Sequence, residues 1–146
     1  YTPRLTSIFA EVLQQLGRER AWCVHGLAGE DVGMDDLSVC GRSRISELRN
    51  GAISTWEIEP ADAGLSLGQL ADLRGDECED NAAIIEGLLS GEVRGTKREM
   101  TLLNAAGGFV VAGLALDLPA GVALAREQLD SGRALAKLRA LQNFRA

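Results

Sequence analysis

AWCVHG at residues 21–26 and GMDDLS at residues 33–38 flank a small acidic loop. The first run is short and apolar and predicts a buried strand, and the second places two adjacent carboxylates, Asp35 and Asp36, beside a glycine. Ligand sites of open α/β sheets lie beyond the carboxyl ends of strands, and Mg²⁺ prefers oxygen ligands. A metal site at Asp35 and Asp36 is therefore one interpretation. On the spacing alone a solvated turn is favoured, because Asp and Gly are ordinary turn residues.

A helix is predicted before this strand. Thr2 suits its cap, Pro3 suits its first turn, and Gly17 is a natural stop. Its apolar residues recur at helical spacing and form one stripe. We expect the stripe to pack on the sheet of this domain, because a strand follows directly after the helix. The stripe comprises Leu5, Ile8, Phe9, Val12, Leu13 and Leu16.

After the acidic loop, the pattern changes from strands to helices. Residues 37–48 are expected to hold one or two short strands, and residues 53–58 a returning strand, with Asn50-Gly51 as the hairpin turn between them. This order predicts one α/β domain over residues 1–146, with a mixed β-sheet flanked by α-helices. The later helices are expected at residues 80–90, 96–114, 118–129 and 131–144.

Composition and charge narrow the functional class. Of 146 residues, 46% are apolar and 25% are charged, which is ordinary for a globular domain with a core. The formal net charge is −6, and nucleic-acid affinity depends on clustered cationic side chains. No apolar run approaches the roughly 20 residues that cross a membrane. We therefore expect neither nucleic acid nor a membrane as a partner.

The cysteines Cys23, Cys40 and Cys78 are odd in number and widely spaced. Without a Cys-x-x-Cys pair, they indicate neither a disulfide framework nor a zinc ribbon. We interpret them as buried free thiols. The alternative is a zinc site that joins them to His25, because Cys23 and His25 would share one face of a strand.

Several polar residues invite a functional interpretation. His25, the single histidine, is interpreted as a hydrogen-bonded structural residue, with acid–base chemistry as the alternative. Asn104 lies inside an apolar helix, and since a buried amide needs partners, we expect it to bond to the backbone of the acidic loop. Lys97 and Arg98 are expected to be solvated, with contact to a phosphate as the alternative.

Short motifs along the chain resemble the carboxyl-terminal part of anthranilate phosphoribosyltransferases. That family typically has VVHG followed by GLDE and Ile/Leu-Ser, which AWCVHG and GMDDLS match with small changes. Each motif is weak alone, but together they keep one order over nearly the whole chain. The other matches are IEPADAGL (58–65), GD (75–76) with NA (81–82), LLSG (88–91), LLNAA (102–106), GV (121–122) and LDSGRA (129–134).

The resemblance implies part of the large domain shared by phosphoribosyltransferases and nucleoside phosphorylases. It implies an enzyme of tryptophan biosynthesis that transfers the phosphoribosyl group of phosphoribosyl diphosphate (PRPP) to anthranilate. Mg²⁺ would be the cofactor, held by Asp35 and Asp36, and no residue here is assigned a catalytic or organic-cofactor role. The diphosphate loop and the anthranilate site are expected in an amino-terminal part, so this chain alone should be inactive. A cytoplasmic homodimer, formed through that part, is also implied.

Two differences separate this chain from the family pattern. Asp36 stands where the family usually has Glu, and the loop at residues 27–32 is several residues longer. Because Asp is one methylene shorter than Glu, the contact of Asp36 with a metal could be direct or through water.

The other interpretations of the chain's function are a non-catalytic nucleic-acid-binding homologue of the same fold, a pyrimidine nucleoside phosphorylase-like enzyme, and a purely structural helical domain.

Overall fold

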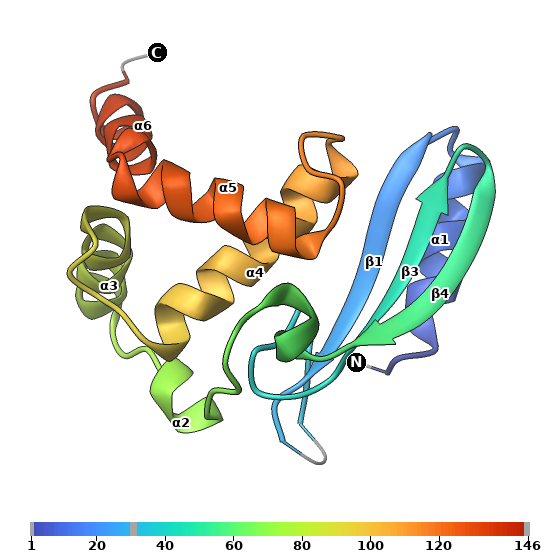
Figure 1. Ribbon diagram of the computed structural model, residues 1–146, viewed down its shortest axis with the longest axis horizontal. Coiled ribbons are helices and arrows are strands. Elements are labelled where there is room, and N and C mark those ends of the chain that lie inside the picture. The colour runs from blue at the N-terminus through green and yellow to red at the C-terminus, as the bar shows by residue number, and fades with distance from the viewer. Residues whose placement is uncertain (1, 30–31, 145–146) are drawn as a thin grey trace.

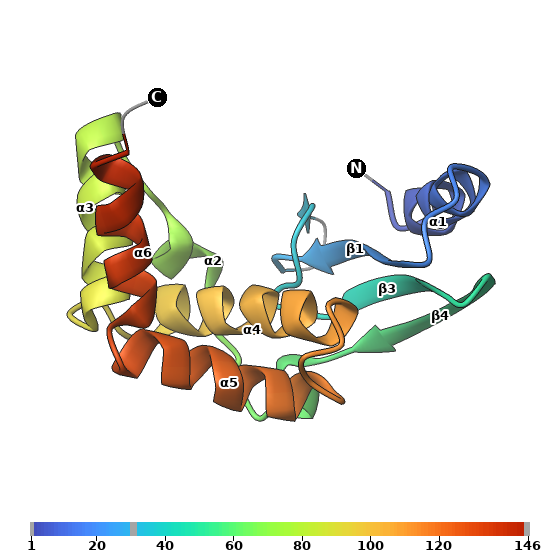
Figure 2. The same cartoon turned by 90° about the horizontal axis from the view of Figure 1, so that it is seen from above.

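A four-stranded sheet organises the chain in the computed structural model, which describes residues 2–29 and 32–144. Its three pairings are antiparallel, and Ile45 lies between Val24 and Trp56 in the register. Helices cover the sheet, as Figures 1 and 2 show, so the predicted α/β class with a flanked sheet is confirmed. In sheet order, the strands are β2 (Gly33–Met34), β1 (Arg20–Leu27), β3 (Ser43–Arg49) and β4 (Ala52–Ile58).

The hairpin between β3 and β4 follows the predicted turn. Asn50 and Gly51 both adopt left-handed backbone conformations, with φ of 51° and 78°. Two such residues match the right-handed twist of the flanking strands, which is why Asn-Gly is favoured there. Of the residues expected to hold one or two strands, only those of β3 form one. Residues 37–42 are irregular and carry the chain back from the acidic loop.

Helix α1 (Leu5–Gln15) covers one face of the sheet (Figure 2), but most of its apolar stripe remains exposed. The buried residues of α1 are Thr6 and Ala10, and the Ser46 hydroxyl of β3 donates to Thr6 Oγ1 at 2.9 Å. These small side chains let the helix approach the sheet closely. The predicted packing of the stripe on the sheet is therefore wrong for most of its members, although Leu5 and Leu13 are half-buried beside β1. Its exposed members are Ile8 (50% exposed), Phe9 (54%), Val12 (43%) and Leu16 (69%).

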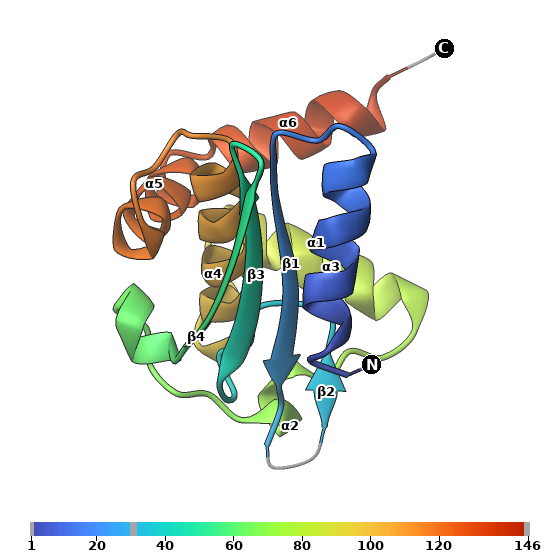
Figure 3. The same ribbon diagram turned by 90° about the vertical axis from the view of Figure 1, so that its right-hand side faces the viewer.

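The main core lies on the opposite face of the sheet, where α4 (Thr96–Val111) packs behind the strands (Figure 3) and α5 (Leu118–Asp130) crosses α4 (Figure 1). Gly121 allows this crossing, because an added Cβ would lie 2.9 Å from Ala106 Cα. Leu37, Ile45 and Leu103 are almost fully buried here. The helical elements are η1 (Pro60–Ala63), α2 (Leu70–Leu73), α3 (Cys78–Ser90), α4 (Thr96–Val111), α5 (Leu118–Asp130) and α6 (Arg133–Gln142).

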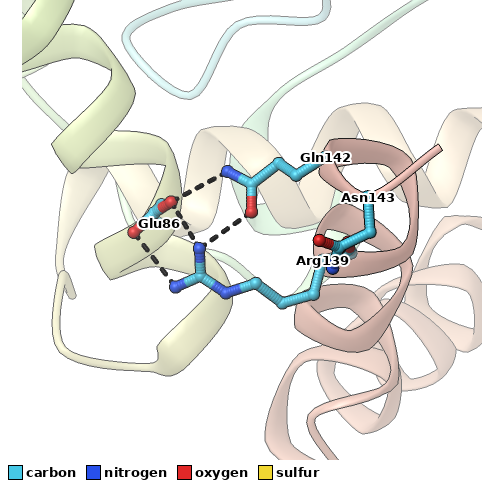
Figure 4. A network of polar contacts seen from close by, with 4 residues as sticks. All are labelled: Glu86, Arg139, Gln142 and Asn143. Carbon is cyan, nitrogen blue, oxygen red and sulfur yellow. Dashed lines mark hydrogen bonds and ion pairs between the residues drawn. The ribbon is translucent and has the colours of Figure 1, made fainter. Parts of the chain in front are cut away.

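Helices α3 and α6 lie side by side at the end of the molecule away from the sheet (Figures 1 and 2). Arg139 joins them with a forked contact to Glu86, at 2.7 Å from Nη1 to Oε1 and 3.1 Å from Nη2 to Oε2, and Gln142 donates to the same carboxylate (Figure 4). The hydrogen bonds and charge of Arg139 lower the pKa of Glu86. The pair is exposed, so it contributes little to stability.

Within the described ranges, no helix combines the length and apolar character needed to cross a membrane.

Candidate metal site

Asp35 and Asp36 directly follow β2, which pairs with the carboxyl end of β1 (Figure 3). Both are exposed, and Asp35 lines a mainly apolar cavity of about 340 Å³ together with His25. The structure therefore brings the acidic pair to the end of a strand, next to the single histidine. The centre of the longer loop, Glu30 and Asp31, lies outside the described residues.

Two glycines allow the acidic loop to pack against β1. A Cβ on Gly26 would lie 2.5 Å from the carbonyl oxygen of Asp36 and 2.7 Å from Ser38 Cβ. A Cβ on Gly33 would lie 2.8 Å from His25 Nε2. These distances are far inside normal contact, so the glycines of the quoted motifs are required by close approach.

Side chains anchor the backbone immediately after the acidic pair. Leu37 N–H donates to Asn104 Oδ1 at 2.9 Å, and Asn104 Nδ2 donates to the Leu37 carbonyl at 2.8 Å. Asn104 thus bonds to the backbone as expected, but at Leu37, the residue directly after the acidic loop. Ser38, whose role we did not predict, donates from Oγ to the Leu27 carbonyl at 2.6 Å and accepts from Cys40 N–H at 3.0 Å. The only sequence signal for Ser38 is its place at the end of GMDDLS.

The electrostatics of the pair favour a cation. Partial burial and the neighbouring charge of Asp35 raise the pKa of Asp36. None of the ion pairs among the described residues involves either carboxylate. Two adjacent oxygen donors without a cationic partner fit Mg²⁺, which one or two carboxylates commonly hold together with substrate phosphates. Asp35 and Asp36 are the residues here that would hold it.

The structure changes our interpretation of His25. It is buried, at 5% exposure, and packs over Gly33, which fits the expected structural role. However, no hydrogen bond joins its ring to another described residue, so the expected hydrogen bonding is not found there. The cause is its place on the α1 face of β1, where the surrounding cavity wall is mainly apolar.

The cysteines are free thiols, but they are less buried than expected. Cys23 and Cys40 are half-buried, and Cys78 is exposed because it starts α3 at the surface. Burial raises the pKa of Cys23, and burial with the Asp72 charge raises that of Cys40. In the part of the chain that is described, no three His, Cys, Asp or Glu residues gather to hold a metal ion, so the zinc alternative lacks a ligand set.

Lys97 and Arg98 are not simply solvated, contrary to expectation. Arg98 is only 8% exposed and pairs with Asp130 of α5 at 2.6 Å. Lys97 Nζ donates to the backbone carbonyls of Asp72 and Arg74, the latter at 2.7 Å. Both side chains turn back onto neighbouring segments, so they stabilise the start of α4.

Several known proteins are similar to this chain in sequence and in fold. The anthranilate phosphoribosyltransferase of Desulfatibacillum aliphaticivorans is 39% identical over 144 residues, which are 99% of this chain and 41% of that protein. The crystal structure of the Thermus thermophilus anthranilate phosphoribosyltransferase has a TM-score of 0.84 and 36% identity, over 95% of this chain and 39% of that one. The Saccharomyces cerevisiae enzyme in complex with PRPP and Mg has a TM-score of 0.83 at 23% identity, over 95% and 39%, which supports the fold alone.

These relatives confirm the resemblance that the motifs indicate, and this chain spans about two-fifths of their length. Residues 1–135 also match the family described as glycosyl transferase family, a/b domain. With a match over most of its length, a shared fold and the acidic motif after β2, this chain belongs to the glycosyl transferase family a/b domain.

Proposed function

We propose that the full-length protein is an anthranilate phosphoribosyltransferase of tryptophan biosynthesis. It transfers the phosphoribosyl group of PRPP to the amine of anthranilate, and this chain contributes the metal-binding part. The relatives' shared activity supports the substrates. The observation that carries the proposal is the acidic pair, Asp35 and Asp36, which lacks a cationic partner among the described residues and is followed directly by an anchored backbone at Leu37 and Ser38.

The chemistry assigns a charge-stabilising role to this pair. The amine nitrogen attacks the anomeric carbon of the ribose, the bond to the diphosphate oxygen breaks, and the amine then loses a proton. Mg²⁺, when bound, neutralises the charge that develops on the leaving diphosphate. Asp35 and Asp36 would hold and orient the metal, Asp36 directly or through water. Neither acts as a nucleophile.

We also propose that this chain is the carboxyl-terminal part of the enzyme. Alternate residues of an antiparallel strand direct their backbone groups to opposite neighbours. On one edge of β1, strand β2 pairs only with Gly26 and Leu27 and leaves the earlier residues of β1 without a described partner strand. Trp22 and Val24 present their backbone groups to that same edge, and no described strand lies beside them. Unpaired strand edges are usually covered in native proteins.

The same edge adjoins the uncovered stripe of α1. Phe9 and Val12 are about half exposed, and they line the 340 Å³ cavity between α1 and β1. A further strand from the rest of the protein would pair with β1 and bury this apolar surface. Hydrogen exchange tests this in the full-length protein, where the Trp22 and Val24 amides should be as protected as that of Cys23. Fast exchange at Trp22 and Val24 alone would contradict a strand at this edge.

The oligomeric state and the cellular location of the full-length protein are proposed together with its activity. We propose a cytoplasmic homodimer formed through the amino-terminal part, so this chain should make no part of the dimer contact. Light scattering of the full-length protein should give the mass of two copies. A monomer at working concentrations would contradict the dimer without affecting the proposed activity.

Product analysis tests the activity. Full-length protein with PRPP, anthranilate and Mg²⁺ should release pyrophosphate and phosphoribosyl-anthranilate in equal amounts, and omission of PRPP is the control. The 146-residue chain alone should give no product. Phosphate-dependent cleavage of a pyrimidine nucleoside, without transfer to anthranilate, would instead support the nucleoside phosphorylase alternative.

A further inference from the structure

Asn104 forms the same pair of hydrogen bonds to the backbone of Leu37 that a residue of a paired β-strand would form. Its amide accepts from the N–H of Leu37 at 2.9 Å and donates to the Leu37 carbonyl at 2.8 Å, which satisfies both backbone groups of one residue. Asn104 also donates to the Met100 carbonyl one turn earlier in α4, at 3.1 Å. The contact joins residues 67 positions apart. It therefore ties the loop to the main core helix.

The residues after Asp36 are held from several sides. The Leu37 side chain is 2% exposed, and a Cβ on Gly107 of α4 would lie 3.0 Å from its Cδ1. Ser38 bonds through its hydroxyl to the Leu27 carbonyl and through its N–H to Ser43 Oγ. In contrast, the carboxylates of the acidic pair are exposed and free of ion pairs with described residues. The backbone beneath them is thus fixed while their oxygens face solvent.

We propose that Asn104 is a positioning residue that sets the affinity of the acidic pair for a divalent cation. This rests on the proposed metal role of Asp35 and Asp36. Adjacent carboxylates repel each other, so a loosely held loop would separate them when no cation is bound. Asn104 prevents this by fixing Leu37, the next residue. Its two functional atoms are both needed, because Leu37 presents a donor and an acceptor.

Substitutions at Asn104 separate positioning from simple packing. Asn104→Leu removes both bonds, and Asn104→Asp keeps the acceptor but removes the donor. Thr101→Val is the matched control, because Thr101 lies one turn earlier on α4 and its hydroxyl bonds to the Lys97 carbonyl and to no other described residue. All three variants lose a polar contact of one helix, but only the first two release the loop.

The readout is Mn²⁺ binding to the full-length protein in the presence of PRPP, measured by electron paramagnetic resonance. Loss of a residue that orients a metal ligand typically weakens metal affinity by about 10- to 100-fold. We expect that loss for both Asn104 variants and wild-type affinity for Thr101→Val. Melting temperatures show whether each variant is folded, and Asn104→Asp remains as the test if Asn104→Leu does not fold.

The possible outcomes distinguish this inference from the proposed function. Wild-type Mn²⁺ affinity in a folded Asn104 variant would overturn the positioning role. An equal loss of affinity in Thr101→Val would also overturn it, because the effect would then follow from weakened packing of α4. The metal role itself is tested separately by Asp35→Asn with Asp36→Asn. Loss of Mn²⁺ affinity in that double variant, but in neither Asn104 variant, would leave the proposed function standing and reject this inference alone.

Discussion

Replacing Gly26 with alanine should displace the acidic loop by a predictable distance. Gly26 does not have a positive φ, so alanine fits its backbone conformation and only the available space matters. The added Cβ would lie 2.5 Å from the Asp36 carbonyl oxygen, whereas ordinary contact begins near 3.4 Å. The loop must therefore withdraw by about 0.9 Å, the difference between these distances.

This displacement has two measurable costs. Overpacking of a close contact typically lowers the free energy of unfolding by about 1–3 kcal/mol. A misplacement of about 1 Å at a reacting site can lower turnover by roughly 100-fold. We expect both effects in the full-length Gly26→Ala protein, together with a higher Mg²⁺ requirement. Urea unfolding and steady-state anthranilate phosphoribosyl transfer over a Mg²⁺ series measure them.

Two other glycines on the main core helices provide matched controls. Gly108→Ala adds a Cβ with no atom within 4 Å, so it should stabilise α4 by about 0.5–1 kcal/mol and leave kinetics unchanged. Gly121→Ala should be destabilising, because its Cβ would lie 2.8 Å from the Ala106 carbonyl oxygen, but the Mg²⁺ requirement should stay normal. Wild-type turnover and Mg²⁺ dependence in Gly26→Ala would refute the argument.

Three further predictions follow from burial and charge. Burial and the charge of Asp35 raise the pKa of Asp36 above its ordinary value of 3.8. Without metal, the native state should therefore lose stability as the pH rises from 3.8 through the raised pKa, because the unfolded chain releases its proton first. Thermal melts should show this loss in wild type and not in Asp36→Asn. Arg139→Gln should move the pKa of Glu86 up toward its usual value, because Arg139 is the main cause of the lowering; an unchanged carboxyl titration by NMR would contradict this. Leu103→Ala should reduce the free energy of unfolding by about 2–5 kcal/mol in denaturant titrations, since Leu103 is fully buried, and a loss below about 1 kcal/mol would contradict its core role.

The sequence predicted the parts of the fold that local signals determine. The Asn50-Gly51 turn requires left-handed residues, and Gly91 ends α3 in the same conformation, with φ of 85°. Such signals depend on the conformation of one or two residues, so they can be recognised without tertiary structure. The acidic pair was likewise placed after a strand from its motif.

Features that depend on distant packing could not be predicted. Helical spacing identified an apolar stripe on α1, but the side that meets the sheet depends on how closely Thr6 and Ser46 approach. Arg98 was expected in solvent, because nothing near it in sequence indicates its partner Asp130, 32 positions later. The anchoring by Ser38 is similar, since a serine after two acids gives no sign of its bond across the loop.

The most direct test of the proposed metal site is Mn²⁺ binding in the presence of PRPP, measured by electron paramagnetic resonance on the full-length protein. Wild type is compared with Asp35→Asn combined with Asp36→Asn, a change that removes both charges from exposed positions and should leave the fold intact. The proposed site predicts that the double variant loses Mn²⁺ affinity by at least about 10-fold. A folded double variant with wild-type Mn²⁺ affinity would contradict it.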